Sequence, residues 1–587
     1  MSPQPRAATR GRPVRRLDSP LVATVARRGR FHVAEPLFHR ATPVALDGRR
    51  ASEGDLVLVG SGKRGARVLR TLGRPDVARD VLEGLMLDRG LRRSFPQKVE
   101  LEALESAAES IGADGRADLR DLPTFTIDPP DSRDFDDAIS ARREDDRIRL
   151  WVHIADVTAY VRPGGVVDQE AARRATSVYV PGAVEPMLPE ELSNKACSLR
   201  PGEDRLAVTV ELELRGTDVL AVRFQRSLIR SDARLTYPQV DEVFEGRARA
   251  EEPWGEPLAA ARAVAAALRE RRDARGSLEV NSAEPVFEFD SEGRVTGVGH
   301  EPQTESHRVI EELMVLANER VAGYLSDARL PTLYRVHERP DPQSVEFMVE
   351  QLASLDVPTP SIPERMSPQQ AADAAAEASH LVARYCERTG RGKRAFGSLV
   401  LRSLKQAYYT PRNLGHAGLA SPRYCHFTSP IRRLPDIAVH RGLLSGLGLD
   451  DAAPPAHELE EAGVESSARE REAMIVERDA DDVCRAFLLE RVLAESDPGQ
   501  RFPGEVVGLI AKGAFVRFGD EGFEGLLPVR RMRGWWELNE LGTALEAEGG
   551  GRLRFGDPVE VEVERVEAPR GRVDLAPPGQ TSRPRVS

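Results

Sequence analysis

The sequence predicts a multidomain protein in which an α+β domain is flanked by two all-β modules of the OB type. The first observation is length, because 587 residues exceed one hydrophobic core and suggest about three or four domains. The second is that short strand patterns separated by glycine occupy both ends of the chain. The third is that the middle mixes strand-like and helix-like patterns, which is typical of an α+β domain.

The amino-terminal part begins with residues 1–16, which are rich in Arg and Pro and have almost no apolar content. We expect a disordered basic arm there, because this composition cannot bury enough apolar surface to offset the entropy of ordering. Residues 17–72 then contain strand-like runs broken by glycine, which predict a small barrel of the OB or cold-shock type. The runs are Val22–Val25, Phe31–Val33, Thr42–Leu46 and Asp55–Val59.

The middle of the chain is expected to contain a linker and the α+β domain. Residues 73–117 should form a helical linker, because apolar residues recur at helical spacing between Asp76 and Leu91. Residues 118–498 make up the α+β domain. Its expected strands are Ile148–Val157 and Arg205–Leu214, and its expected helices are Glu256–Arg272, His307–Leu325, Pro342–Ala353, Ser367–Arg388 and His457–Glu495.

The carboxy-terminal part, residues 499–577, again consists of short runs with glycine at the turns. The runs are Gly504–Val507, Gly513–Phe518, Gly525–Pro528 and Phe555–Val563. The pairing of Gly-Ala-Phe-Val with Gly-Leu-Leu-Pro is similar to the S1 RNA-binding module, an OB-type barrel. A β-barrel without a ligand is the alternative. We expect residues 578–587 to be a disordered tail.

Composition limits the location and the partners. The formal net charge of −11 argues against a uniformly basic coat for nucleic acid, although a local basic surface remains compatible with it. The four cysteines are far apart and form no CxxC pair, so neither a zinc ribbon nor a disulfide framework is predicted. Free cysteines fit a reducing cytosol, and no apolar run reaches the roughly 20 residues that span a bilayer. We therefore expect a cytoplasmic monomer without a membrane segment.

The most distinctive stretch is an acidic cluster around a proline pair. Its four carboxylates, within ten residues, are Asp128, Asp134, Asp136 and Asp137. Pro129 and Pro130 cannot continue a strand or a helix, so the chain must turn there and bring the acids together. Concentrated negative charge is costly unless hard divalent cations such as Mg²⁺ or Mn²⁺ neutralise it. A solvated acidic turn is the alternative, whereas Arg133 and Ile139 at positions 6 and 12 exclude an EF-hand loop.

Five ordered blocks carry a resemblance to a known family. The cluster has the pattern Thr-Ile-Asp-x5-Asp-Phe-Asp-Asp-Ala, and four further blocks follow it in the chain. These blocks are Val152–Val157, Thr176–Leu199, His307–Met314 and Tyr424–Arg433. Together they resemble the ribonuclease II/ribonuclease R family of 3′-to-5′ exoribonucleases. The resemblance implies an RNB catalytic domain flanked by a cold-shock-like module and an S1-like module.

The resemblance also implies roles for the acids. Asp128, Asp134 and Asp137 would mainly hold metal, while Asp136 would help to position metal and the attacking water. Two Mg²⁺ ions, with Mn²⁺ as a substitute, can activate water and stabilise the leaving oxygen in phosphodiester hydrolysis. Arg432 would grip the scissile phosphate, and Glu477 matches a position near the metal site. Without the resemblance, Arg432 would be an ordinary surface arginine and Glu477 an exposed helical acid.

Contacts with the RNA strand follow from the same resemblance. Tyr179 matches the first of two aromatic residues that clamp the terminal base, but Val280 occupies the second position and cannot stack comparably. Glu311 matches an acid that contacts the terminal ribose, with an ordinary helix acid as the alternative. Phe515 is expected to stack on a base, which is worth about 1–3 kcal/mol.

We therefore expect a Mg²⁺-dependent exoribonuclease that degrades single-stranded RNA to nucleoside 5′-monophosphates, with processivity implied by the resemblance. One rival is a non-catalytic RNA-binding regulator that keeps the fold, and it predicts loss of at least one metal acid. The other rival is a metal-dependent DNA nuclease or phosphodiesterase of another class. A substrate with a deoxyribose end would separate that rival from the RNA enzyme.

Overall fold

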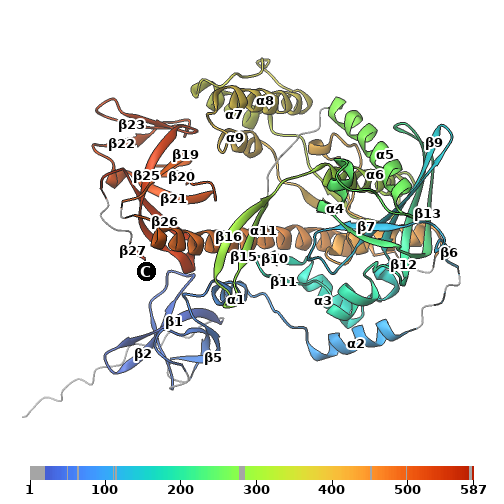
Figure 1. Ribbon diagram of the computed structural model, residues 1–587, viewed down its shortest axis with the longest axis horizontal. Helices are drawn as coiled ribbons and strands as arrows, with labels where there is room; N and C mark the ends of the chain where they lie inside the picture. The colour runs from blue at the N-terminus through green and yellow to red at the C-terminus, as the bar shows by residue number, and fades with distance from the viewer. Residues whose placement is uncertain are drawn as a thin grey trace, which may run out of the picture.

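The computed structural model describes residues 20–580, except residues 49–50, 63–64, 110–111, 113–114, 276–283, 450–452 and 498, and it also describes residues 585–586. Two sequence-based expectations lie outside the described residues. They are the basic arm at residues 1–16 and the replacement of the second base-clamping aromatic residue by Val280. Figure 1 shows an amino-terminal β module, a large mixed central domain and a carboxy-terminal β module, with the long helix α11 (Ala456–Glu495) running between them.

The amino-terminal module is a five-stranded antiparallel sheet of order β3-β2-β1-β4-β5. Its strands are β1 (Leu21–Arg28), β2 (Phe31–Pro36), β3 (Val44–Ala45), β4 (Leu56–Ser61) and β5 (Ala66–Gly73). Ala23, Val25, Val57 and Val59 are buried in its core because alternate residues of a strand face the same side. The predicted OB-type module is therefore confirmed at this end.

The linker consists of two helices, α1 (Ala78–Asp88) and α2 (Gln97–Ala108). The apolar pattern suggested one helix continuing to Leu91, but α1 ends earlier, before Gly90 adopts a positive φ of 80°. Such a backbone angle favours glycine and ends helices. Leu82 and Leu85 of α1 pack beneath the amino-terminal sheet and beside α11. The linker thus joins the first module to the long helix.

The central domain is built on a seven-stranded sheet of order β14-β7-β8-β9-β12-β13-β6. Its strands are β6 (Ala117–Asp118), β7 (Phe125–Asp128), β8 (Asp137–Glu144), β9 (Arg147–Ala155), β12 (Asp204–Arg215), β13 (Asp218–Arg230) and β14 (Ala233–Thr236). One face packs on α4 (Tyr237–Phe244), α5 (Gly255–Ala274) and α6 (Glu305–Asp327). The other packs on α2, α3 (Val166–Arg174) and α10 (Leu434–Gly446). The predicted α+β class is confirmed.

Smaller elements surround this sheet. They are the hairpin β10 (Val178–Val180)/β11 (Ala183–Glu185), the ribbon β15 (Glu284–Phe289)/β16 (Val295–Glu301), the pair β17 (Tyr334–Val336)/β18 (Tyr408–Thr410), and the helices α7 (Pro342–Ser354), α8 (Pro368–Thr389) and α9 (Phe396–Ser403). The three helices form their own apolar cluster, and Figure 1 shows them above the gap between the central domain and the carboxy-terminal module.

The carboxy-terminal module is a barrel, because β19 pairs with both β20 and β25 and closes the sheet β19-β20-β21-β26-β25-β27. The strands are β19 (Arg501–Ile510), β20 (Gly513–Phe518), β21 (Phe523–Pro528), β25 (Pro558–Glu567), β26 (Arg572–Ala576) and β27 (Arg585–Val586). A small sheet of β22 (Trp536–Leu538), β23 (Ala544–Ala547) and β24 (Arg552–Arg554) extends from it. Strand β27 lies in the stretch for which a disordered tail was expected.

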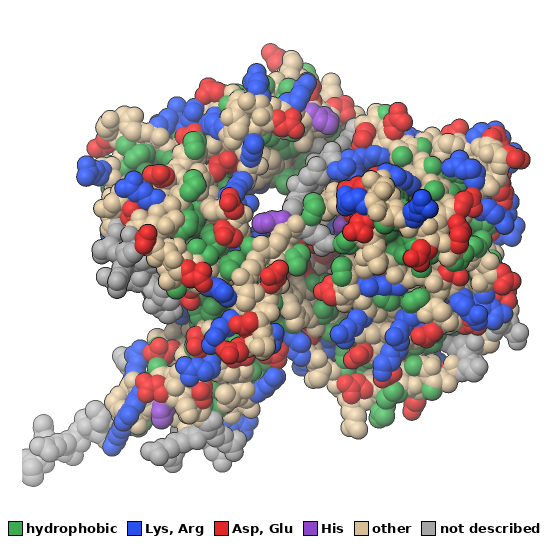
Figure 2. All heavy atoms as spheres, viewed as in Figure 1, with side chains coloured by type: hydrophobic (Ala, Val, Ile, Leu, Met, Phe, Trp, Pro, Cys, Tyr) green, Lys and Arg blue, Asp and Glu red, His purple; other side chains and the backbone are tan. Residues whose placement is uncertain are grey.

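No helix in the described part of the chain is both long enough and apolar enough to cross a bilayer. Figure 2 shows acidic and basic side chains interspersed over the visible face, with a hollow between the central domain and the carboxy-terminal module.

Candidate active site

The four aspartates of the acidic cluster stand on and between two neighbouring strands. Strand β7 ends at Asp128, the chain turns at the prolines, and β8 begins at Asp137. The amide of Ser132 donates to the carbonyl of Pro129 at 3.2 Å, which closes the turn. The Arg234 guanidinium donates to the carbonyl oxygens of Pro129 and Pro130 at 2.6 and 2.8 Å. The turn predicted from the proline pair is present, and the Arg234 side chain, which lies outside the turn, stabilises it.

One buried hydroxyl fixes the middle of this turn. The Oγ of Ser198 accepts from the amide of Phe135 and donates to the carbonyl of Arg133, each at 3.0 Å. These two backbone groups flank Asp134, and Ser198 is fully buried. The sequence motif contained Ser198 but gave no sign of this role, because a serine hydroxyl binds whichever backbone groups the fold brings to it. Ser198 therefore positions the acidic turn.

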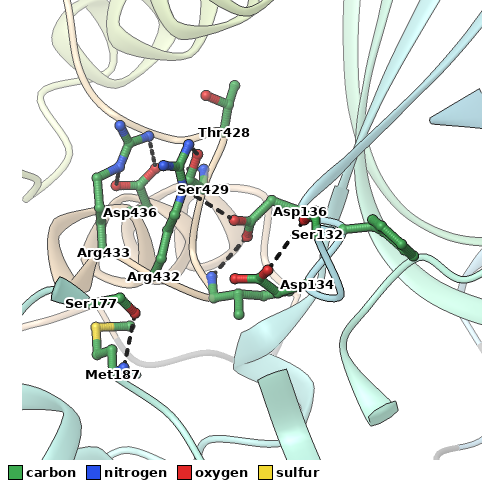
Figure 3. A network of polar contacts seen from close by, with 12 residues as sticks. Ser132, Asp134, Asp136, Ser177, Met187, Thr428, Ser429, Arg432, Arg433 and Asp436 are labelled. Carbon is green, nitrogen blue, oxygen red and sulfur yellow. Dashed lines mark hydrogen bonds and ion pairs between the residues drawn. The ribbon is translucent and has the colours of Figure 1, made fainter. Parts of the chain in front are cut away.

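Asp136 is bound by the chain that leads into α10. Its Oδ1 accepts from the amide of Ile431 at 2.9 Å, and its Oδ2 lies 3.6 Å from Nε of Arg432 (Figure 3). Burial raises the pKa of the Asp136 carboxyl well above its usual value, while the nearby Arg432 guanidinium and the Ile431 amide oppose that rise. Asp136 and Arg432, which are 296 positions apart in the sequence, thus lie next to each other in the structure.

The segment that carries Arg432 is braced by a buried ion pair. Arg433 donates to both oxygens of Asp436 at 2.9 and 2.8 Å, and the Ser429 amide donates to the same carboxylate at 2.8 Å (Figure 3). Arg433 therefore faces the helix, whereas the Arg432 side chain is 48% exposed beside Asp136. Of these two adjacent arginines, only Arg432 can still reach a bound anion.

Asp128 and Asp137 are acids whose negative charge is poorly compensated. Burial, and secondly the charge of Asp137, raises the pKa of Asp128 to about 7. Burial also raises the pKa of Asp137 to about 6, against the opposing effect of Arg432. The Oδ2 atom of Asp128 is buried without a hydrogen-bond partner. Oxygen donors in this condition suit a hard divalent cation, which would supply the missing positive charge.

The side chains do not, however, form a finished metal cage. Among the residues that the structure describes, no three acid, histidine or cysteine side chains are arranged to hold one ion. Asp134 is turned toward other partners, since its oxygens accept from Ser132 Oγ and the Tyr179 hydroxyl, both at 3.4 Å. Asp136 is similarly occupied by Ile431 and Arg432. The donors of the predicted metal site are together in one turn, but Asp134 and Asp136 are each engaged by other groups.

Tyr179 and Glu477 meet at the edge of the acidic turn. The Tyr179 amide in β10 donates to Oε1 of Glu477 in α11 at 2.9 Å, and the Tyr179 residue is 39% exposed. Burial raises the pKa of the Glu477 carboxyl. The alternative interpretation of Glu477, an exposed helical acid, does not describe its surroundings. The structure instead joins Tyr179, Glu477 and Asp134 in one chain of contacts.

Glu311 lies one helical turn from an aromatic contact near the acids. On α6, His307 stacks on Tyr237 with ring centroids 3.7 Å apart. Tyr237 follows Thr236, which pairs with Asp128 across β14 and β7. Glu311 itself forms an ion pair with Arg272 at 2.9 Å. Its carboxylate is therefore engaged by a structural cation, and no contact with the four aspartates is observed among the described residues.

Phe515 lines a groove at the carboxy-terminal barrel. The groove has a volume of about 600 Å³ and lies between the barrel, α11 and the amino-terminal module. The cations that line it are Arg40, Arg485, Lys512, Arg530, Arg565 and Arg572. Arg485 lies eight residues beyond Glu477 on α11, which corresponds to about 12 Å along the helix. The groove and the acidic turn are thus connected by one rigid element.

Comparisons with known proteins agree with this architecture. The RNB domain model matches residues 116–448, and the S1 RNA binding domain model matches residues 495–576. Ribonuclease R of Escherichia coli is 34% identical over 555 residues, covering 90% of this chain and 66% of that protein. Ribonuclease R of Aquifex aeolicus is 34% identical over 561 residues, covering 92% and 77%. The chain spans just under two thirds of the length of the Escherichia coli relative.

Two solved structures extend the comparison. Mycoplasma genitalium RNase R in complex with ribose methylated single-stranded RNA has a TM-score of 0.82 at 24% identity, covering 95% of this chain and 89% of that one. Yeast Ssd1, a pseudonuclease, has a TM-score of 0.64 at 16% identity, covering 91% and 68%. Because the RNB model covers more than half of the chain and the curated relatives exceed 30% identity, this chain belongs to the RNB family of ribonuclease R.

Proposed function

We propose that the chain is a divalent-metal-dependent hydrolase that degrades single-stranded RNA processively from the 3′ end to nucleoside 5′-monophosphates, in RNA turnover. The observation that carries the proposal is the convergence of four aspartates with Arg432 and Tyr179 on one turn, beside the helix that leads to the groove. The curated relatives named Ribonuclease R and the RNase R structure that contains single-stranded RNA support it.

The metal in this proposal is Mg²⁺, with Mn²⁺ as a substitute, held by Asp128, Asp134, Asp136 and Asp137. The unpartnered Oδ2 of Asp128 and the raised pKa values of Asp128 and Asp137 support this assignment. When bound, such ions supply an activated water and neutralise charge on the phosphate oxygens. Asp134 would have to exchange its weak contact with the Tyr179 hydroxyl for a metal ion.

The chain's own residues would orient the phosphodiester. Arg432, half-exposed and 3.6 Å from Asp136, can donate to the scissile phosphate, because a guanidinium matches two phosphate oxygens at once. It would stabilise charge that develops there in the transition state. Asp136, held by the Ile431 amide, would keep its second oxygen directed at the same point. Glu477 acts through Tyr179 by holding the backbone of that residue in place.

Recognition of the RNA strand would occur at two places. The exposed ring of Tyr179 can stack on the terminal base, and Glu311 would accept from the terminal ribose if it leaves Arg272. Farther out, Phe515 can stack on another base while the groove cations contact phosphates. The functional modules would be residues 17–72, 118–498 and 499–577. We further assign the protein to the cytoplasm as a monomer, which four free cysteines suit.

A non-catalytic RNA-binding role is the second candidate, because the yeast pseudonuclease Ssd1 shares the fold. Incubation with 5′-labelled oligoadenylate separates the two functions. The proposed enzyme shortens the labelled RNA stepwise in Mg²⁺ and stops when EDTA is added. A deoxyribose at the 3′ end slows removal of the first nucleotide. Tight binding without metal-dependent shortening would establish the regulator instead. Equal rates on the ribose and deoxyribose ends would instead indicate a nuclease of another class.

A further inference from the structure

A second cavity adjoins the candidate active site. It has a volume of about 340 Å³ and lies between the chain that follows α1, the end of α3 and the middle of α11. This volume is in the range of pockets for small ligands. Thr176 lines the cavity, and its hydroxyl also donates to the carbonyl of Arg432 at 3.3 Å. Val476, another lining residue, directly precedes Glu477. The cavity and the site therefore share a wall.

The cavity, which we name the arginine pocket, collects positive charge from three segments. Its lining arginines are Arg89, Arg92, Arg173, Arg174 and Arg469. The Arg92 guanidinium has no ion-pair partner among the described residues. In the described part of the chain, Arg469 forms an ion pair with Glu472 alone, at 2.7 Å, and both side chains are about half exposed or more. Because exposed ion pairs of this kind contribute little, Arg469 and Arg92 are both available to an anionic ligand.

The arginine pocket also offers an apolar surface. Leu91, Ala473, Ile475 and Val476 line it, and Ile475 is 50% exposed. Guanidinium groups beside an apolar floor match a nucleotide, because its phosphate takes the hydrogen bonds and its base covers the floor. A simple phosphate ion would leave this apolar floor uncovered.

A buried carboxylate gives a second, independent sign of a ligand. Glu185 lines the pocket and is only 3% exposed. Its Oε1 accepts from the Arg92 amide at 2.8 Å and from Arg174 at 2.7 Å. Its Oε2 is buried without a hydrogen-bond partner. Unsatisfied buried oxygens are costly, so this atom calls for a donor such as a base amino group or a ribose hydroxyl.

We infer that the arginine pocket binds a nucleoside 5′-monophosphate on its way from the active site. The inference rests on the proposed function, since that reaction releases this compound next to the shared wall. The phosphate would contact Arg92 and Arg469, and the nucleoside would cover Ile475 and reach toward Glu185. Added nucleoside monophosphate would occupy this pocket, block the path of newly released product and so inhibit RNA degradation.

The test is calorimetric titration of the whole protein with AMP and, separately, with inorganic phosphate. The parent is compared with the double variant Arg92→Ala/Arg469→Ala, with the charge-conserving Arg92→Lys/Arg469→Lys, and with Arg143→Ala. Arg143 is an exposed arginine at the far end of β8 and serves as the matched control. Circular dichroism verifies that each variant is folded. The double alanine variant should bind AMP about tenfold more weakly or worse, as expected when charged hydrogen bonds are lost.

The lysine variant should lie between the parent and the alanine variant, and Arg143→Ala should equal the parent. In assays with RNA, the inhibition constant for AMP should rise in the alanine variant, while its rate without AMP stays unchanged. If the double alanine variant binds AMP as tightly as the parent, the inference is overturned. If the parent binds phosphate and AMP with equal affinity, the nucleotide assignment is overturned. Calorimetry does not depend on catalysis. A parent that is inactive on RNA but still binds AMP in this pocket would therefore refute the proposed function without refuting the binding site.

Discussion

The two charged regions along α11 are built in opposite ways. At the acidic turn, Asp136 is 5% exposed, and the carboxyl groups of Asp128, Asp136 and Asp137 have raised pKa values because of burial. At the groove, five of the six lining cations are exposed. Buried charge is costly and persists where a specific partner neutralises it, whereas exposed charge acts through its sum. The first region therefore suits chemistry and the second suits binding.

The largest effect is expected when a buried acid loses its charge. Asp136→Asn keeps the size of the side chain and can still accept from the Ile431 amide, but it cannot offer a metal an anionic oxygen. We expect the loss of essentially all turnover while RNA affinity, measured by fluorescence anisotropy, stays near the parent value. Glu521→Gln, an acid outside both regions, is the control. Joint loss of turnover and affinity would place Asp136 in binding rather than in chemistry.

Arg432 tests whether the exposed cation beside the acids belongs to the chemical region. Removing one donor that stabilises transition-state charge costs about 10²–10³ in kcat, so Arg432→Ala should fall in that range. Arg432→Lys should recover part of the rate, because it keeps the charge but loses the second hydrogen bond. Single-turnover rates measure the step. If the effect appears only in KM, Arg432 acts like a groove cation instead.

Phe515 should affect binding and spare chemistry. Phe515→Ala removes one stacking surface, which is worth about 1–3 kcal/mol of RNA affinity. The rate at saturating RNA should not change, because the barrel lies outside the acidic turn. Phe515→Tyr, which keeps an aromatic face, is the matched control. If Phe515→Ala lowers the rate at saturating RNA, the groove contributes to the chemical step as well as to binding.

The smallest effect concerns the joint between α11 and the carboxy-terminal barrel. Burial raises the pKa of Glu490 to about 7 from 4.5, and an amide of the barrel at Ala568 partly opposes this. The folded protein therefore retains a proton that the unfolded chain releases between these values, so this group lowers stability as the pH rises through that window. Glu490→Gln should reduce the difference in Tm between pH 5 and pH 8, with Glu495→Gln as the control. An unchanged difference would contradict the raised pKa.

Much of the fold follows from local patterns. Glycine-bounded strands and apolar helix spacing predicted both barrels and most long helices, because turns and amphipathic periods depend on neighbouring residues. The end of α1 was misplaced since Leu91 continues the apolar pattern while the backbone at Gly90 leaves the helix. The pairing of β6 with β13 and of β27 with β25 involves residues distant in sequence, which no local pattern encodes.

In the candidate site, too, local sequence predicts some features, while others depend on residues distant in the chain. Asp128, Asp134, Asp136 and Asp137 could be selected from spacing and a family motif, because they lie in one turn. Ser198 and Arg234, which hold that turn, could not be assigned a role, since each acts through backbone groups about 65 or more residues away. The engagement of Glu311 by Arg272 was equally hidden, because ion pairs between α5 and α6 depend on how the helices pack.

A direct measurement of metal binding is the sharpest test of the difference between the acidic turn and the groove. Mn²⁺ is titrated into the protein, and the signal of free Mn²⁺ is followed by electron paramagnetic resonance for the parent, Asp136→Asn and a groove variant, Arg530→Ala/Arg572→Ala. The account predicts that the parent and the groove variant remove Mn²⁺ from solution equally, whereas Asp136→Asn does so far more weakly. Equal Mn²⁺ binding by Asp136→Asn and the parent would contradict it, because the buried acids would then not be the metal site.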